Sequence, residues 1–93
     1  MKSIMQDEKV CYFSDRTDNL EMHHIFPGPN RKHSEKYGLK VYLTHDLHNE
    51  PPDGVHFNRA RSDALKRAAQ KKFEETHTRE EFMKIFGRNY VFE

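Results

Sequence analysis

Histidine is the residue type whose placement in this sequence most clearly indicates chemistry. Six of the seven histidines lie between positions 23 and 56, namely His23, His24, His33, His45, His48 and His56. A neutral imidazole binds divalent cations, and its pKa near neutrality also lets it transfer protons. The pattern therefore predicts a metal site with a general base beside it.

The adjacent pair His23 and His24 lies near the end of residues 20–25, which begin with an alternating pattern and predict a short strand. Neighbouring side chains of a strand point to opposite faces, so one ring can hold a cation while the other faces a substrate. The alternative interpretation is structural, with one ring satisfied in the core and the other exposed.

A second strand must hold this pair in place. Pro27, Gly28 and Pro29 break the first strand, and a polar loop is expected over residues 31–38. Residues 39–44 then alternate between apolar and polar, which predicts a strand that pairs antiparallel with the first.

A turn and then a helix should follow the two strands. Residues 45–54 include two prolines and a glycine and are expected to form the turn. Helical periodicity begins near Val55, with Asp53 as the candidate cap and Ser62 as a later start. The expected apolar stripe contains Phe57, Ala60 or Arg61, Ala64 or Leu65, Ala68 and Phe73.

A short second helix is predicted near the end of the chain. Thr78 to Glu81 has the spacing of a capping box, and Gly87 is suited to end the helix. The aromatic side chains of residues 89–92 are expected to pack back on the body. The element order predicts an α+β fold.

Composition limits the architecture to one small domain. The 93 residues are 34% hydrophobic and 33% charged, so the core must be thin, and Cys11 is the sole cysteine, which excludes an intrachain disulfide. Residues 1–10 are polar and expected to be flexible. The sequence shows no signal peptide and no run of membrane-spanning length, and we expect a cytoplasmic protein without a membrane partner.

Charge is unevenly distributed along the chain. Residues 31–72 hold ten Lys or Arg against five Asp or Glu, whereas the rest holds six against ten. A basic segment in a near-neutral protein favours contact with phosphates, although a solvated helix face has the same composition. The candidate nucleic-acid contacts are Arg31, Lys32, Arg59 and Lys66.

Several segments together resemble the HNH nuclease family, and in particular the small HNH proteins of bacteriophages and prophages. They are LEMHHIF at 20–26, NRK at 30–32, KYGL at 36–39, GVHFN at 54–58 and FMKIFG at 82–87. The resemblance implies a ββα-metal core, in which a two-stranded antiparallel hairpin packs on a helix, together with the short C-terminal helix. It also implies divalent-metal-dependent hydrolysis of DNA phosphodiester bonds.

The resemblance also implies roles for individual histidines. His24 matches the general base that activates water, and His23 matches the metal ligand before it. The closing metal ligand is His56 or His48, with His56 favoured because it lies where the helix is expected to begin. The expected cation is magnesium or manganese, and imidazole ligands would also accept nickel or zinc.

The middle asparagine of the family is not clearly placed in this sequence. Asn30 is the nearest candidate, and Asn58 could play a supporting catalytic role on the helix. A turn residue after Pro-Gly-Pro and a surface residue in the first helical turn are the respective structural alternatives.

The chain departs from the family at the structural zinc knuckle, which normally contains two Cys-x-x-Cys pairs. Here only Cys11 stands in register, because Ser14, Thr44 and Leu47 occupy the other positions. Thr and Leu do not replace thiolate ligands, so no structural zinc is expected. The residues expected to fill the vacated space are Phe13, Leu43, Leu47 and Phe57.

The sequence therefore favours a metal-dependent DNA endonuclease acting in the cytoplasm of a bacterial host. The alternative is a catalytically inactive HNH-like phage protein that binds and inhibits a host protein, or that binds nucleic acid. The oligomeric state is left open, a dimer included.

Overall fold

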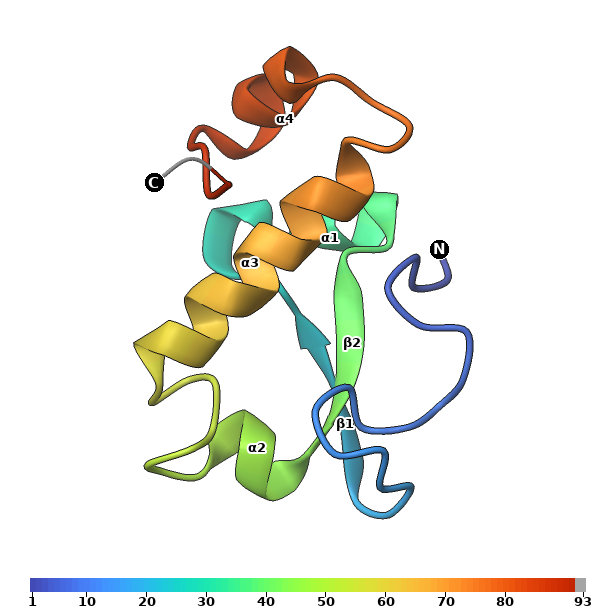
Figure 1. Ribbon diagram of the computed structural model, residues 1–93, viewed down its shortest axis with the longest axis vertical. Coiled ribbons are helices and arrows are strands. Elements are labelled where there is room, and N and C mark those ends of the chain that lie inside the picture. The colour runs from blue at the N-terminus through green and yellow to red at the C-terminus, as the bar shows by residue number, and fades with distance from the viewer. Residues whose placement is uncertain (92–93) are drawn as a thin grey trace.

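A computed structural model describes residues 1–91 of the chain as a two-stranded sheet surrounded by short helices (Figure 1). The elements are β1 Leu20–His24, the 3-10 turn η1 Gly28–Asn30, α1 Arg31–Tyr37, β2 Lys40–Thr44, α2 His45–Asn49, α3 Arg59–Phe73 and α4 Arg79–Phe86. The α+β class predicted from the sequence is confirmed, as are the antiparallel pairing and the short C-terminal helix. Within residues 1–91, every helix is too short or too polar to cross a bilayer.

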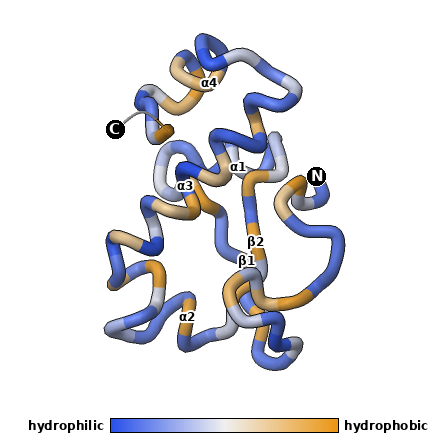
Figure 2. The backbone as a smooth tube through the Cα atoms, viewed as in Figure 1, coloured by the Kyte–Doolittle hydropathy of each residue, from blue (hydrophilic) through white to orange (hydrophobic). Residues whose placement is uncertain are grey.

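The register of the sheet separates the two adjacent histidines of β1. His23 pairs with Val41 and His24 with Lys40. Val41 belongs to the core cluster with Leu43, and the tube in Figure 2 alternates between hydrophobic and hydrophilic colours along β2. Because alternate residues share a face, His23 lies on the core side of the sheet and His24 on the other side.

The prediction of a loop over residues 31–38 is wrong, because residues 31–37 form α1. The helix is fixed by tertiary contacts that its polar sequence does not reveal. Ser34 is fully buried, and its hydroxyl accepts from the amide of Phe26 and donates to the carbonyl of the same residue. Gly38 ends the helix at φ 71°, and a Cβ there would lie 2.4 Å from the Lys2 carbonyl oxygen.

The helices α2 and α3 begin at other residues than the sequence predicts. Residues 45–49 of the expected turn form α2. The long helix α3 starts at Arg59, later than Val55 and earlier than Ser62, and its cap is Asn58, whose side chain accepts from the Arg61 amide at 3.0 Å. Its buried residues are Leu65, Ala69, Gln70 and Phe73, so the expected stripe is correct only at Leu65 and Phe73.

The helix α4 closes the other end of the core from α2 (Figure 1). The predicted capping box and the left-handed Gly87 are both present. Phe82 and Phe86 pack on Phe26, with ring centroids 5.5 and 4.5 Å away. Tyr90 of the tail also packs on Phe26 at 5.3 Å, as expected for this segment, whereas Phe92 lies outside the described residues.

The N-terminal residues run beside β2, on the side away from β1 (Figure 1). The flexibility expected of residues 1–10 stays a prediction. The amide of Ile4 donates to the Gly38 carbonyl, and the amide of Tyr12 donates to the Tyr42 carbonyl. The amide of Tyr42 in turn donates to the side chain of Gln6. This segment therefore lies along the edge of β2 that does not pair with β1.

Candidate metal centre

Three imidazoles converge where β1 meets α2 and the link to α3. His23 comes from β1 and is 5% exposed, His48 from the last turn of α2, and His56 from the link. Their ring centroids lie 5.1, 5.2 and 4.8 Å apart, and one nitrogen of each lies within 4.8 Å of the others. The sequence left His48 and His56 as alternatives, and the structure brings both to His23.

The backbone of the link fixes His56 against α2. The amide of Val55 donates to the Leu47 carbonyl at 2.9 Å, and the amide of His56 donates to the His48 carbonyl at 3.3 Å. Gly54 makes this fold-back feasible, because a Cβ there would lie 2.6 Å from the Glu50 amide nitrogen. The two rings are thereby held with their Nε2 atoms 3.1 Å apart.

Glu21 orients one of the three rings from the same face of β1 as His23. The Nδ1–H of His48 donates to one oxygen of Glu21 at 2.7 Å, and the Nδ1–H of His45 donates to the other at 2.7 Å. The amide of Asn49 adds a third donor at 3.1 Å. The donor hydrogen bonds from His48 first, then from His45, lower the pKa of Glu21 to about 2. With Nδ1–H engaged, His48 presents the Nε2 lone pair to the cluster.

Burial keeps the innermost ring neutral. It lowers the pKa of His23 to about 3, and repulsion from His48 and then His56 acts in the same direction. Burial and the nearby His48 also lower the pKa of His56. Neutral imidazoles carry the lone pairs that a cation requires, so the donor set fits a divalent metal with nitrogen ligands.

His24 does not join this cluster. Its Nε2–H donates to the Glu35 carboxylate of α1 at 2.8 Å, and its side chain is 10% exposed. Glu35 also accepts from Lys40 Nζ at 2.8 Å, and this bond first, then the one from His24, lowers the pKa of Glu35 to about 2. Nδ1 of His24 has no hydrogen-bond partner among residues 1–91. The structure thus presents His24 as a ring with one nitrogen fixed and one available.

The two candidate asparagines lie at helix starts outside the cluster. Asn30 is the cap residue of α1 and its side chain makes no cap hydrogen bond. Asn58 caps α3, and its amide also donates to the Pro52 carbonyl at 3.4 Å. The capping contact supports the structural interpretation of Asn58.

The candidate nucleic-acid contacts divide into two groups. Arg31 and Lys32 are exposed at the start of α1, which lies between β1 and β2 in the chain. Arg59 is exposed, with a loose ion pair of 3.5 Å to Asp63, and Lys66 is half-buried on α3. Arg59 and Lys66 are the pair that lines the same surface hollow as His56.

The positions of the zinc knuckle hold a packed, non-ligating contact. Cys11 is fully buried, with Sγ 3.8 Å from the Thr44 hydroxyl and accepting from the Thr44 amide at 3.5 Å. Leu43 is buried, and Phe13 and Leu47 pack against the core, as expected of fillers. These residues do not fit a tetrahedral zinc, which needs four good ligands. The fourth expected filler, Phe57, is wrong, because it is 59% exposed.

Sequence reasoning missed Glu21 and Glu35, the carboxylates that hold His48 and His24. A signal for Glu21 existed, since positions 21 and 23 share one face of the predicted strand. No signal existed for Glu35, because its helix was expected to be a loop. Comparisons with family models, with curated proteins and with solved structures give no match to this chain.

Proposed function

We propose that this chain is a metal-dependent endonuclease of the HNH type that hydrolyses DNA phosphodiester bonds. The observation that carries the proposal is the convergence of His23, His48 and His56 within 4.8 Å of one another. Three histidines from three segments of the chain meet there. A fourth, His24, directly follows His23 in the sequence and is held by a carboxylate. A histidine with a purely structural role does not require two other imidazoles beside it.

The arrangement of elements also favours a ββα-metal core. An antiparallel hairpin, β1 and β2, shares one hydrophobic cluster with α3, whose Leu65 and Phe73 pack with Val41. The metal ligands lie on β1 of the hairpin, on α2 and on the link from α2 to α3. This is the placement that the resemblance implies for such a core.

His23, His48 and His56 would hold the cation. Three nitrogen donors favour nickel or zinc over magnesium and manganese, which prefer oxygen ligands. A bound divalent cation would supply Lewis-acid stabilisation of the scissile phosphate and of the leaving oxygen. Glu21 keeps His48 in the tautomer whose Nε2 can bind, and the buried His23 stays neutral down to acidic pH.

His24 would act as the general base through Nδ1. Because Nε2–H stays on Glu35, the lone pair must lie on Nδ1, which can accept a proton from the attacking water. His23 and His24 point to opposite faces of β1, and the strand ends at His24, so the phosphodiester would pass around the end of the strand to meet both rings. Arg59 and Lys66 beside His56 would bind neighbouring phosphates. Arg31 and Lys32 would bind phosphates further along the DNA strand.

Cleavage of supercoiled plasmid in the presence of Mn²⁺, Mg²⁺, Ni²⁺ or Zn²⁺ tests the proposal. We expect nicking by the native chain, and a loss of at least about 100-fold in His24→Ala, since a general base contributes that much or more. Metal affinity should be unchanged in His24→Ala and lost in His56→Ala. His77→Ala, which removes an imidazole outside the cluster, is the matched control.

Identical behaviour of the native chain and His24→Ala with every metal refutes the enzyme. A stable complex with a host protein that is unaffected by substitution of His23 or His24 would then favour the inactive binding protein. DNA binding that is strongly salt-dependent and occurs without cleavage would instead favour a nucleic-acid-binding module.

A further inference from the structure

An exposed aromatic ring lies directly beside the metal centre. Phe57 follows His56 in the link to α3, and it is 59% exposed. Single exposed apolar residues are common and need no explanation by themselves. Here, however, Phe57 and His56 line the same open hollow of about 370 Å³, so the ring borders a space next to the imidazole.

The same hollow is lined by three cationic side chains and one carboxylate. Arg59, Lys66 and Arg88 supply the cations, and Asp63 supplies the carboxylate, which pairs with Arg59 at 3.5 Å. Lys66 and Arg88 pair with no carboxylate among residues 1–91. Two cations without a counter-charge therefore face one space.

Tyr90 gathers these two cations. The Lys66 ammonium lies 5.6 Å from the centroid of the Tyr90 ring, and the Arg88 guanidinium lies 5.2 Å from it. Both distances are in the range of cation–π contacts. One aromatic ring thus contacts both cations.

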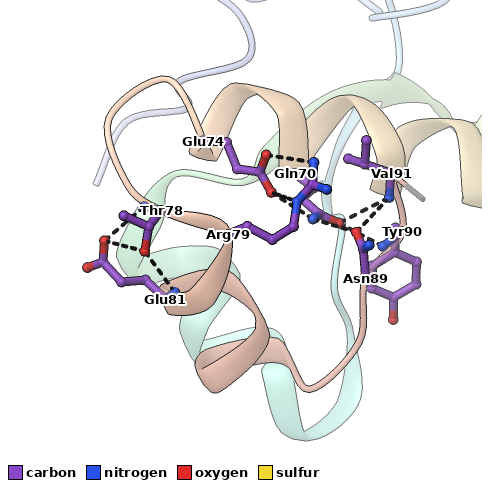
Figure 3. Close-up of polar contacts among 8 residues, drawn as sticks. All are labelled: Gln70, Glu74, Thr78, Arg79, Glu81, Asn89, Tyr90 and Val91. Carbon is purple, nitrogen blue, oxygen red and sulfur yellow. Dashed lines mark hydrogen bonds and ion pairs between the residues drawn. The ribbon is translucent and has the colours of Figure 1, made fainter.

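A buried amide fixes the tail that carries Arg88 and Tyr90 (Figure 3). Gln70 of α3 is fully buried, and its oxygen accepts from the amide of Tyr90 at 2.7 Å. Its nitrogen donates to the Asn89 side chain and to Glu74, both at 2.8 Å. A surface tail held by a buried polar network has a defined position, so the hollow has a defined wall.

We propose that this hollow binds an unpaired nucleotide of a single-stranded DNA segment that flanks the scissile phosphate. The exposed face of Phe57 stacks on the base, and Lys66 and Arg88 bind the neighbouring phosphates. An aromatic platform beside unpaired cations is the arrangement with which proteins hold single strands. A base within a duplex has its faces covered by its neighbours and cannot use Phe57. The place of the nucleotide beside the scissile bond rests on the function proposed above.

Binding measured in chelator, without cleavage, tests this subsite. Fluorescence anisotropy with labelled single-stranded and duplex DNA compares the native chain with Phe57→Ala and Phe57→Leu. Loss of one stacked base should weaken single-strand binding by about 5- to 150-fold in both variants, and duplex binding by less than about threefold. Phe57→Leu keeps an apolar side chain without an aromatic ring. It therefore separates aromatic stacking on the base from the burial of apolar surface. Met83→Ala removes another exposed apolar residue, on α4, and should change neither.

Two further readouts examine the ring and the cations separately. The chain contains no tryptophan, so Phe57→Trp places a single tryptophan at the hollow, and single-stranded DNA should quench its selectively excited fluorescence. Lys66→Gln and Arg88→Gln should each reduce the slope of log K against log salt for the single strand by about 0.7. Lys71→Gln, a cation of α3 that does not line the hollow, should leave the slope unchanged.

Equal single-strand affinity of the native chain and Phe57→Ala, or an unquenched tryptophan, overturns the subsite. Tighter binding of single-stranded RNA than of DNA in a parallel titration overturns the assignment to DNA. Both outcomes are independent of cleavage. A chain that binds single strands through Phe57 but cuts no DNA with any metal would retain the subsite and lose the nuclease.

Discussion

Acidification of the metal-free chain should lower its unfolding free energy, because His23 of the metal centre is buried and neutral. His23 is 5% exposed, and burial together with His48 and His56 lowers its pKa from 6.5 to about 3. In the unfolded chain the same ring takes up a proton near its ordinary pKa. Between these two values the unfolded state binds more protons than the folded state, so stability falls as the pH falls from 6.5 toward 3.

The size of this effect follows from the gap between the two pKa values. Each unit is worth about 1.4 kcal/mol, so between pH 6.5 and about pH 5 His23 should remove about 2 kcal/mol of unfolding free energy. The full interval would remove about 5 kcal/mol. Glu21 and Glu35, whose pKa values are lowered from 4.5, add to the loss only at still lower pH. His45, with a raised pKa, acts in the opposite direction in all three chains of the comparison below.

Urea unfolding, followed by circular dichroism at several pH values in chelator, measures this loss. The native chain is compared with His23→Gln, which cannot titrate, and with His33→Gln as the control for removing an imidazole outside the cluster. We expect the native chain and the control to lose about 2 kcal/mol more than His23→Gln on going to about pH 5. Parallel pH dependences in all three chains would refute the reasoning, whatever their absolute stabilities.

Three substitutions test the carboxylates and the buried amide. Glu21→Gln should weaken Zn²⁺ binding by about 10- to 100-fold, because the carboxylate no longer holds the His48 ring; unchanged affinity in a calorimetric titration contradicts this role. Glu35→Gln should leave metal affinity unchanged and lower kcat for plasmid nicking by up to about 100-fold, and equal turnover would show that the carboxylate does not position the base. Gln70→Leu should lower the unfolding free energy by about 1–3 kcal/mol, since the partly buried amide of Tyr90 loses its acceptor; a denaturant midpoint like that of the native chain would exclude it.

The strands and the final helix could be predicted because their signals are local. Residues 20–24 and 40–44 alternate between faces, which the antiparallel register confirms. Thr78 and Gly87 mark the two ends of α4 through side-chain and backbone preferences that act within a few residues.

The remaining elements depend on contacts between distant residues. Residues 31–37 are polar and show little helical periodicity, and their helix is held by Ser34 on the backbone of Phe26. The start of α3 was misplaced because Phe57 was assigned to an apolar stripe. The structure instead turns Phe57 outward before Asn58 caps the helix.

The candidate site was predictable in its residue types and only partly in its geometry. His23, His48 and His56 were named as metal ligands, with the last two as alternatives. The fold-back of residues 54–56 onto α2, which places both rings together, depends on backbone hydrogen bonds that no periodicity reports. The separation of His24 from His23 follows from strand alternation, whereas its carboxylate partner Glu35 does not.

The convergence of the three imidazoles on one cation is tested most directly by calorimetric titration of the metal-free chain with Zn²⁺. The structure predicts one high-affinity cation per chain, and loss of that binding in both His48→Ala and His56→Ala. A native chain that binds no cation, or a His48→Ala or His56→Ala variant that binds Zn²⁺ as tightly as the native chain, would contradict the metal centre.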